Sequence, residues 1–262
     1  MQEPRHHASA LAALGLVAAL AAPAAQALTA SAEATIDWNN LTLDFLSGAG
    51  TLGADTTYVQ TWRFAPGGGP SVDAADAASD WTSSLVAALP FDDGTTLVDV
   101  VASADTAAIA ATAHVDSPLG LASFGGASQS AHTWRAGNLE ALADGMLLVT
   151  VPFALSVVSD EPGLGVYAYA SLSVSHWNPA DDNTHVSYSA WANATVDEYL
   201  DVLAGARSGL LSLAVPLVAG ETFALHGAVD VSMYAPVPLP PLVWLPGACA
   251  AMLLGARRVP AR

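Results

Sequence analysis

Apolar and polar residues alternate with a period of two along the central part of the chain. Val149, Val151 and Phe153, for example, alternate with Thr150 and Pro152. Such alternation puts apolar side chains on one face and polar or small ones on the other, as in a half-buried antiparallel strand. The four clearest stretches predict strands at residues 149–157, 166–175, 186–194 and 222–233.

Shorter stretches of similar composition predict strands at 32–38, 41–45, 58–64, 96–101, 107–114 and 210–215. Turn-forming residues separate them, as at Asp92-Asp93-Gly94, Pro162-Gly163 and Ala219-Gly220. About ten strands without strand–helix alternation predict an all-β fold. We expect an antiparallel, jelly-roll-like β-sandwich over residues 28–236, because two sheets packed face to face bury both apolar faces. A small closed barrel is the alternative.

Two segments also fit a helix. Ala74, Ala78, Trp81 and Leu85 recur at helical spacing within residues 72–89, although the same stretch fits a strand pair broken at Ser79-Asp80. Residues 138–143 fit a single helical turn.

The first 27 residues have the features of a secretory signal. A basic start is followed by an apolar run at residues 10–22 and then by Pro23. Ala25 and Ala27 form a small-x-small cleavage site, so the mature chain would begin at Leu28 after Sec-type export. The alternative is a buried N-terminal helix.

Residues 237–262 form a second processing segment. The proline-rich Val237-Pro238-Leu239-Pro240 precedes an uncharged apolar stretch at 242–256, and Arg257-Arg258 follow. This is a stop-transfer arrangement with its basic side in the cytoplasm. Fifteen helical residues reach only ~22 Å, short of a ~30 Å hydrocarbon core, so we expect a short transmembrane helix that anchors weakly.

This order of proline motif, apolar span and arginine pair resembles the PEP-CTERM sorting signals of Gram-negative bacteria, in their Val-Pro-Leu-Pro form. The resemblance covers about a tenth of the chain. It implies recognition by an exosortase, a membrane enzyme that cleaves near the proline motif. It also implies transient anchoring in the inner membrane, then transfer to the cell surface or release, commonly alongside exopolysaccharide. A plain C-terminal membrane anchor is the alternative.

Composition narrows the function. The formal net charge is −17, and all seven basic residues are arginine. Residues 28–236 hold 23 of the 24 acidic residues and three arginines, a charge of −20. Such a surface argues against a nucleic-acid partner. The single cysteine, Cys249, excludes an internal disulfide framework. Together these features favour an exported structural or adhesive protein, without enzymatic activity or a cofactor, that acts beside exopolysaccharide.

The body carries six tryptophans, and two of them suggest a binding surface. Trp177 and Trp191 fall opposite the apolar rows of their strands, and Tyr167 and Tyr169 occupy the matching face of the neighbouring strand. If that face is exposed, these rings form a platform for sugar rings, with the two tryptophans side by side. The alternative is that they belong to the core or its rim.

Other chemistries have weaker signals. Asp181, Asp182 and Asn183 offer oxygen ligands for calcium on one loop, although turn formation explains them without an ion and is the favoured interpretation. His176 and His185 flank that loop but match no zinc motif. A secreted hydrolase would need a histidine beside a serine or carboxylate in a cleft, and no Gly-x-Ser-x-Gly elbow occurs.

Overall fold

The computed structural model describes residues 27–64, 71–94, 96–118, 128–160, 164–177, 185–196 and 204–235. These residues form an all-β, antiparallel fold, as the period-two pattern predicts. The only helical turn in this described part is a 3-10 turn, η1, at Trp38–Asn40. The strands are β1 (Leu28–Asp37), β2 (Thr42–Phe64), β3 (Ser71–Ala78), β4 (Leu85–Ala88), β5 (Phe91–Asp92), β6 (Leu97–Ala104), β7 (Ala108–Ser117), β8 (Ser128–Ser159), β9 (Gly165–Trp177), β10 (His185–Val196), β11 (Ala204–Leu217) and β12 (Thr222–Tyr234).

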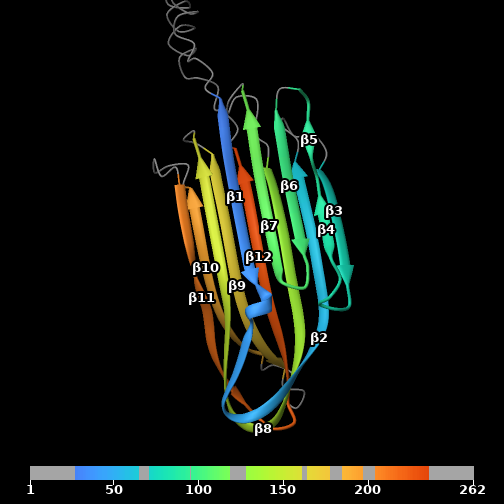
Figure 1. Cartoon of the computed structure of the whole chain (residues 1–262), viewed down its shortest axis with the longest axis vertical. Coiled ribbons are helices and arrows are strands. Elements are labelled where there is room, and N and C mark those ends of the chain that lie inside the picture. Colours follow the sequence, from blue (N-terminus) through green and yellow to red (C-terminus); the bar gives the residue numbers. More distant parts are fainter. Residues whose placement is uncertain are drawn as a thin grey trace, which may run out of the picture.

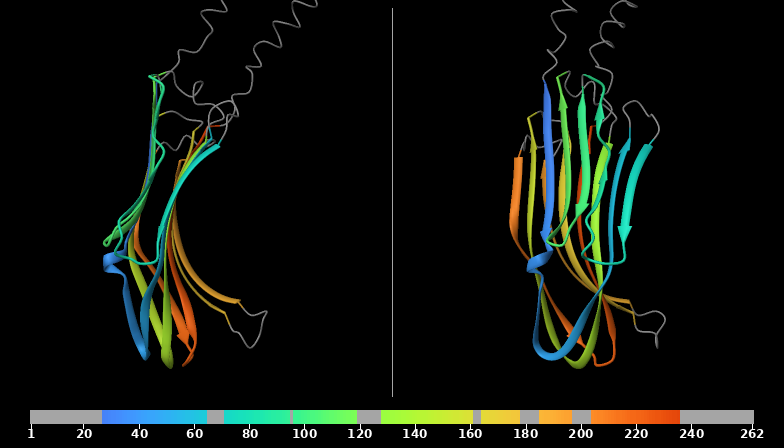
Figure 2. Two further views of the ribbon diagram at one scale, coloured as in Figure 1. Left: turned by 90° about the vertical axis from the view of Figure 1, so that its right-hand side faces the viewer. Right: turned by 45° about the vertical axis from the view of Figure 1, so that its right-hand side comes forward.

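Hydrogen bonds join all twelve strands into one sheet that divides at β8. The first part of β8 lies between β12 and the second half of β2, and this group continues through β9 to β10 on one side and to β3 on the other. The second part of β8 lies between β11 and β1, and this group continues through β7 and β6. Figure 2 shows the two groups as two layers at the end where β1 begins.

The paired strands β2 and β8 connect the layers. They pair from Thr42–Thr150 to Phe64–Ser128, and the register shifts at several places between Phe45 and Gly50. Such bulges bend a strand pair sharply. Gly48 adopts a φ of +82°, a conformation that glycine adopts without strain. The bent pair forms the lower end of the molecule in Figure 1.

Apolar rows of both layers are buried. Alternate residues of β1, β7, β9 and β12 are almost inaccessible to solvent, as are Val149, Val151, Leu155 and Val157 of β8. The predicted apolar row of β10 is buried only at Ala192 and Ala194, whereas Val186 at the other end of the strand is 41% exposed. The alternation therefore gave the correct face for β10, but only one end of that face is covered.

Polar and aromatic contacts cross between the layers. Thr133 of β8 donates its hydroxyl to the Ala110 carbonyl of β7 at 2.7 Å. Arg135, fully buried, donates to the Asp105 carbonyl at 2.7 Å and to the Thr57 hydroxyl at 3.2 Å. Burial lowers the pKa of Arg135. The negative charges of Asp105 and Asp80 oppose this shift.

Trp38 and Trp81 pack edge to face in the same region, with centroids 5.3 Å apart. A Cβ at Gly227 would collide with the Trp38 ring, so this position of β12 requires glycine.

Both helical readings within the body are wrong. Residues 71–78 and 85–88 are strands β3 and β4, and a turn at Ser79–Ser83 separates them. The Asp80 carboxylate stabilises that turn, because it accepts the N–H groups of Thr82 at 2.7 Å and Ser83 at 2.6 Å. These bonds lower the pKa of Asp80. Residues 138–143 continue strand β8.

The predicted processing segments lie mostly outside the described residues. Leu28, the expected first residue of the mature chain, begins β1 and is fully buried. β1 begins and β12 ends at the same end of the molecule (Figure 1). In the described ranges no helix has the length and apolar character to cross a membrane. Residues 1–26 of the expected secretory signal and the helix expected at 242–256 fall outside these ranges.

Candidate functional site

Strand register gathers aromatic side chains on the outer side of one layer. In antiparallel pairs, directly opposite residues point to the same face. One such row reads Trp191–Ser171–Ala228–Trp134–Tyr58 across β10, β9, β12, β8 and β2. The next row includes Tyr169, and the row after it includes Tyr167 and Trp62. We call this outer side the aromatic face, defined by Tyr58, Trp62, Trp134, Tyr167, Tyr169 and Trp191.

The most continuous part of the aromatic face lies on β9 and β10. Tyr167 and Tyr169 have ring centroids 6.1 Å apart and nearly parallel planes, at 15°. Tyr169 and Trp191 follow at 6.4 Å and 27°. Trp191 is 60% exposed. The Tyr234 ring lies against Gly165, at the next outward position along β9. Four rings thus follow one strand.

A second aromatic group lies on β2, β8 and β12. Trp134 is at its centre, with the Tyr58 ring 5.7 Å away and the His226 ring 5.3 Å away. Trp62 and Phe64 make an edge-to-face pair at 4.7 Å farther along β2. The aromatic face therefore consists of two groups of rings, one on β9 and β10 and the other on β2, β8 and β12.

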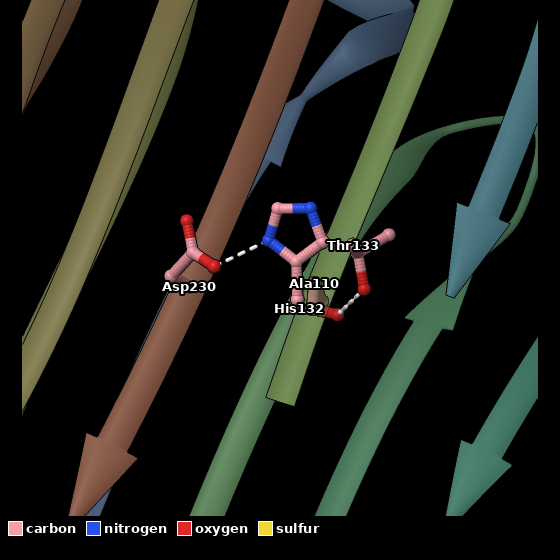
Figure 3. A network of polar contacts seen from close by, with 4 residues as sticks. All are labelled: Ala110, His132, Thr133 and Asp230. Atoms are coloured by element: carbon pink, nitrogen blue, oxygen red, sulfur yellow. Dashed lines mark hydrogen bonds and ion pairs between the residues drawn. The ribbon is translucent and has the colours of Figure 1, made fainter. Parts of the chain in front are cut away.

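A polar pair lies between the two groups. His132 of β8 contacts the Oδ1 atom of Asp230 of β12 through Nδ1 (Figure 3). Thr133, the next residue of β8, points to the opposite side and contacts Ala110. The side chains of His132 and Asp230 are partly exposed, at 35% and 38%. Asp230 lies directly opposite Tyr169 on its other side.

The surroundings shift two pKa values on this face. Partial burial raises the pKa of Tyr167, with smaller contributions from Tyr169 and Asp230. Burial also lowers the pKa of His226, the nearby His132 lowers it further, and Asp230 opposes the shift. At neutral pH the Tyr167 hydroxyl is therefore protonated and can donate a hydrogen bond.

The outer side of the other layer differs. We call it the plain face: the outward positions of β1, β4, β6, β7, β11 and residues 145–159 of β8. A typical row is Glu33–Thr112–Val101, across β1, β7 and β6. No described outward position of these strands carries Trp, Tyr or Phe.

Three of the four predicted platform residues come together. Tyr167, Tyr169 and Trp191 form the β9–β10 run described above. Trp177 does not join it, because its backbone lies opposite His185, whereas Trp191 lies opposite Ser171. Six residues of strand, about 20 Å, separate the two tryptophans, so they are not side by side.

Sequence reasoning missed Tyr58, Trp62, Trp134, His132 and Asp230 as members of one surface. Asp230 was expected on the polar face of its strand, but its partner was not, because residues 128–143 show no clear alternation and were not predicted as a strand. The available signal was the aromatic spacing Trp62–Phe64 and the sequence His132-Thr133-Trp134, in which both outward residues are aromatic rings.

Other candidate chemistry finds limited support. The calcium candidates Asp181, Asp182 and Asn183 lie outside the described residues. Asp92 and Asp93 instead stabilise a turn, accepting the N–H groups of Gly94 at 2.8 Å and Thr96 at 2.7 Å. Among the residues that the structure describes, no cluster of His, Cys, Asp or Glu could hold a metal ion.

The described residues include two histidine–carboxylate pairs, His132–Asp230 and His176–Glu221, the second at 3.3 Å. No described serine hydroxyl is hydrogen-bonded to either imidazole, so neither pair forms the arrangement that serine hydrolysis requires.

Comparison with known proteins gives no relative. No family model matches the chain, and neither the curated proteins nor the solved structures contain a match.

Proposed function

We propose that this is an exported, non-catalytic protein of the cell surface or extracellular matrix that adheres to exopolysaccharide through its aromatic face. We further propose that its body is a jelly-roll-like β-sandwich. The two layers in Figure 2 and the polar contacts between them support that architecture.

One observation carries the adhesive function: large aromatic side chains, Trp191 exposed and the others half-buried, lie on one outer face of the body and not on the other. Exposing aromatic rings to water is unfavourable, so a row of them with no structural need indicates a ligand. Flat rings in a row suit the apolar faces of successive sugars, and the serines and Asn193 between them can bond sugar hydroxyls.

Export rests on the two terminal segments. The Sec-type signal would end at Ala27, where β1 begins one residue later. The PEP-CTERM-like segment would anchor the body briefly and then be cleaved near Pro238 by an exosortase-type enzyme. Mass spectrometry of the extracellular fraction should find termini at Leu28 and near Pro238. An extracellular protein that keeps residues 241–262 would contradict the sorting proposal.

The adhesive function is tested by sedimenting purified full-length protein with exopolysaccharide from its own host. Wild-type protein should co-sediment, and Trp191→Ala should bind about tenfold more weakly, as expected for loss of one stacked ring worth about 1.4 kcal/mol. Leu210→Ala is the matched control, since Leu210 is 64% exposed on the plain face. Equal binding by Trp191→Ala and wild type, or no binding by either, would refute the proposal.

A further inference from the structure

Asp230 occupies the middle of the aromatic face. Across the strands, Tyr169 lies on one side of it and His132 on the other. Trp134 follows His132 two residues along β8. His132 engages only Oδ1 of Asp230, and no described group hydrogen-bonds its Oδ2 atom. A carboxylate with one available oxygen is thus surrounded by aromatic rings.

No arginine among the described residues lies on the aromatic face to balance an acidic ligand. Of the three arginines in the body, Arg135 is buried between the layers and Arg63 lies over the Phe91 ring, on the inner row of β2. Arg207 belongs to β11 in the other layer. Together with a body charge of −20, this disfavours polymers of uronic acids or sulfated sugars, because like charges repel.

We infer that the ligand of the aromatic face is an amino-sugar polymer with free, positively charged amino groups, and that Asp230 binds one of those ammonium groups. The inference rests on the proposed function and specifies its ligand class. A neutral sugar hydroxyl would donate a hydrogen bond to the Asp230 Oδ2 atom and gain nothing more. An ammonium group would gain that bond, the charge attraction and favourable contact with the neighbouring ring faces.

The inference is tested with oligomers of equal length that differ only in charge. Purified full-length protein is titrated with glucosamine oligomers, their N-acetylated counterparts and uronic-acid oligomers, at mildly acidic pH where glucosamine is protonated. Glucosamine oligomers should bind two- to fivefold more tightly than acetylated ones, the range typical of an exposed ion pair, and uronic-acid oligomers should not bind. The preference should shrink as salt is added.

Asp230→Asn should abolish the preference for glucosamine oligomers, because the amide keeps the size of the carboxylate and can still accept from His132 but carries no charge. Asp99→Asn is the control: it removes the same charge from an exposed position of the plain face. Thermal unfolding of both variants verifies that they are folded.

The outcomes separate the two proposals. Equal or tighter binding of acetylated oligomers, a preference insensitive to salt, or the same loss in Asp99→Asn and Asp230→Asn would overturn the inference and leave sugar binding intact. Failure of every oligomer to bind would overturn the proposed function as well.

Discussion

The aromatic face and the plain face are outer sides of the same folded sheet, yet they carry different side chains. On both faces, the outward residues alternate along each strand with buried apolar residues. The plain face is built mainly from Ser, Thr, Ala, Val, Leu and acidic residues. The aromatic face carries six Trp and Tyr residues, of which Trp191 is 60% exposed.

The difference between the two faces distinguishes the side chains that the fold requires from those that it does not. The plain face shows that threonine, serine and alanine satisfy the outward positions of these strands. The inner contacts, such as Trp38 against Gly227 and Arg135 against Asp105, hold the layers together. This contrast supports the proposal that the outward aromatic residues bind a ligand, and the comparison can be tested by changing one face at a time.

The largest effect on stability should come from the inner side of β9. Leu172 is fully buried, whereas its neighbour Ser171 lies outward beside Trp191. Leu172→Ala should lower the free energy of unfolding by about 2–5 kcal/mol, the usual cost of such a cavity. Trp191→Ala should lower it by less than about 1 kcal/mol. Urea unfolding measures both, and equal losses would show that the aromatic face is structural.

The largest effect on binding should come from removing the β9–β10 run. The triple variant Tyr167→Ala, Tyr169→Ala and Trp191→Ala should bind exopolysaccharide about 100-fold more weakly, at about 1 kcal/mol for each ring. The matched triple variant Val86→Ala, Val158→Ala and Leu210→Ala removes exposed apolar side chains from the plain face. Its binding should equal that of the wild type, and a comparable loss would remove the distinction between the faces.

A smaller effect is expected at the second aromatic group. Trp134 lies three strands from Trp191, about 14 Å across the sheet. Trp134→Ala should weaken binding of long oligomers about fivefold and leave that of the shortest ones unchanged, because only long ligands reach both groups. Calorimetry over a length series checks this. A loss independent of length would place both groups in one site.

The smallest effect concerns pH. The pKa of His226 is lowered in the folded protein, so the unfolded chain binds the proton more readily. Above the ordinary pKa of 6.5, the titration of His226 does not reduce the stability of the folded protein. As the pH falls below 6.5, the unfolded chain takes up the proton first and the free energy of unfolding decreases. Thermal unfolding should show a shallower loss in this window for His226→Asn than for wild type. An identical pH dependence would contradict the assignment to His226.

The fold was largely predictable because period-two alternation reports one buried face directly. The clear rows in β9 and β12 gave both the strands and their inner faces. The first part of β8 was missed, because its alternation is obscured by buried polar residues such as Thr133 and Arg135. For β3 the pattern left a helix and a strand open, because its alanines fit both.

The candidate site was only partly predictable. Tyr167, Tyr169 and Trp191 lie on adjacent strands of one hairpin, so a short-range pairing was enough to group them. Trp134 and Tyr58 join them only through β12, which is distant in sequence. The contact of Asp230 with His132 also depends on that long-range pairing. Register across such strands is set by the whole fold rather than by local pattern.

The most direct test of the account follows the indole N–H resonances of the tryptophans during titration with exopolysaccharide fragments, after assignment by single Trp→Phe variants. Binding at the aromatic face predicts that the signals of Trp191, Trp134 and Trp62 shift, while those of the interior Trp38 and Trp81 stay in place. Saturation with polysaccharide that leaves the Trp191 signal unmoved, or that shifts Trp38 and Trp81 equally, would contradict it.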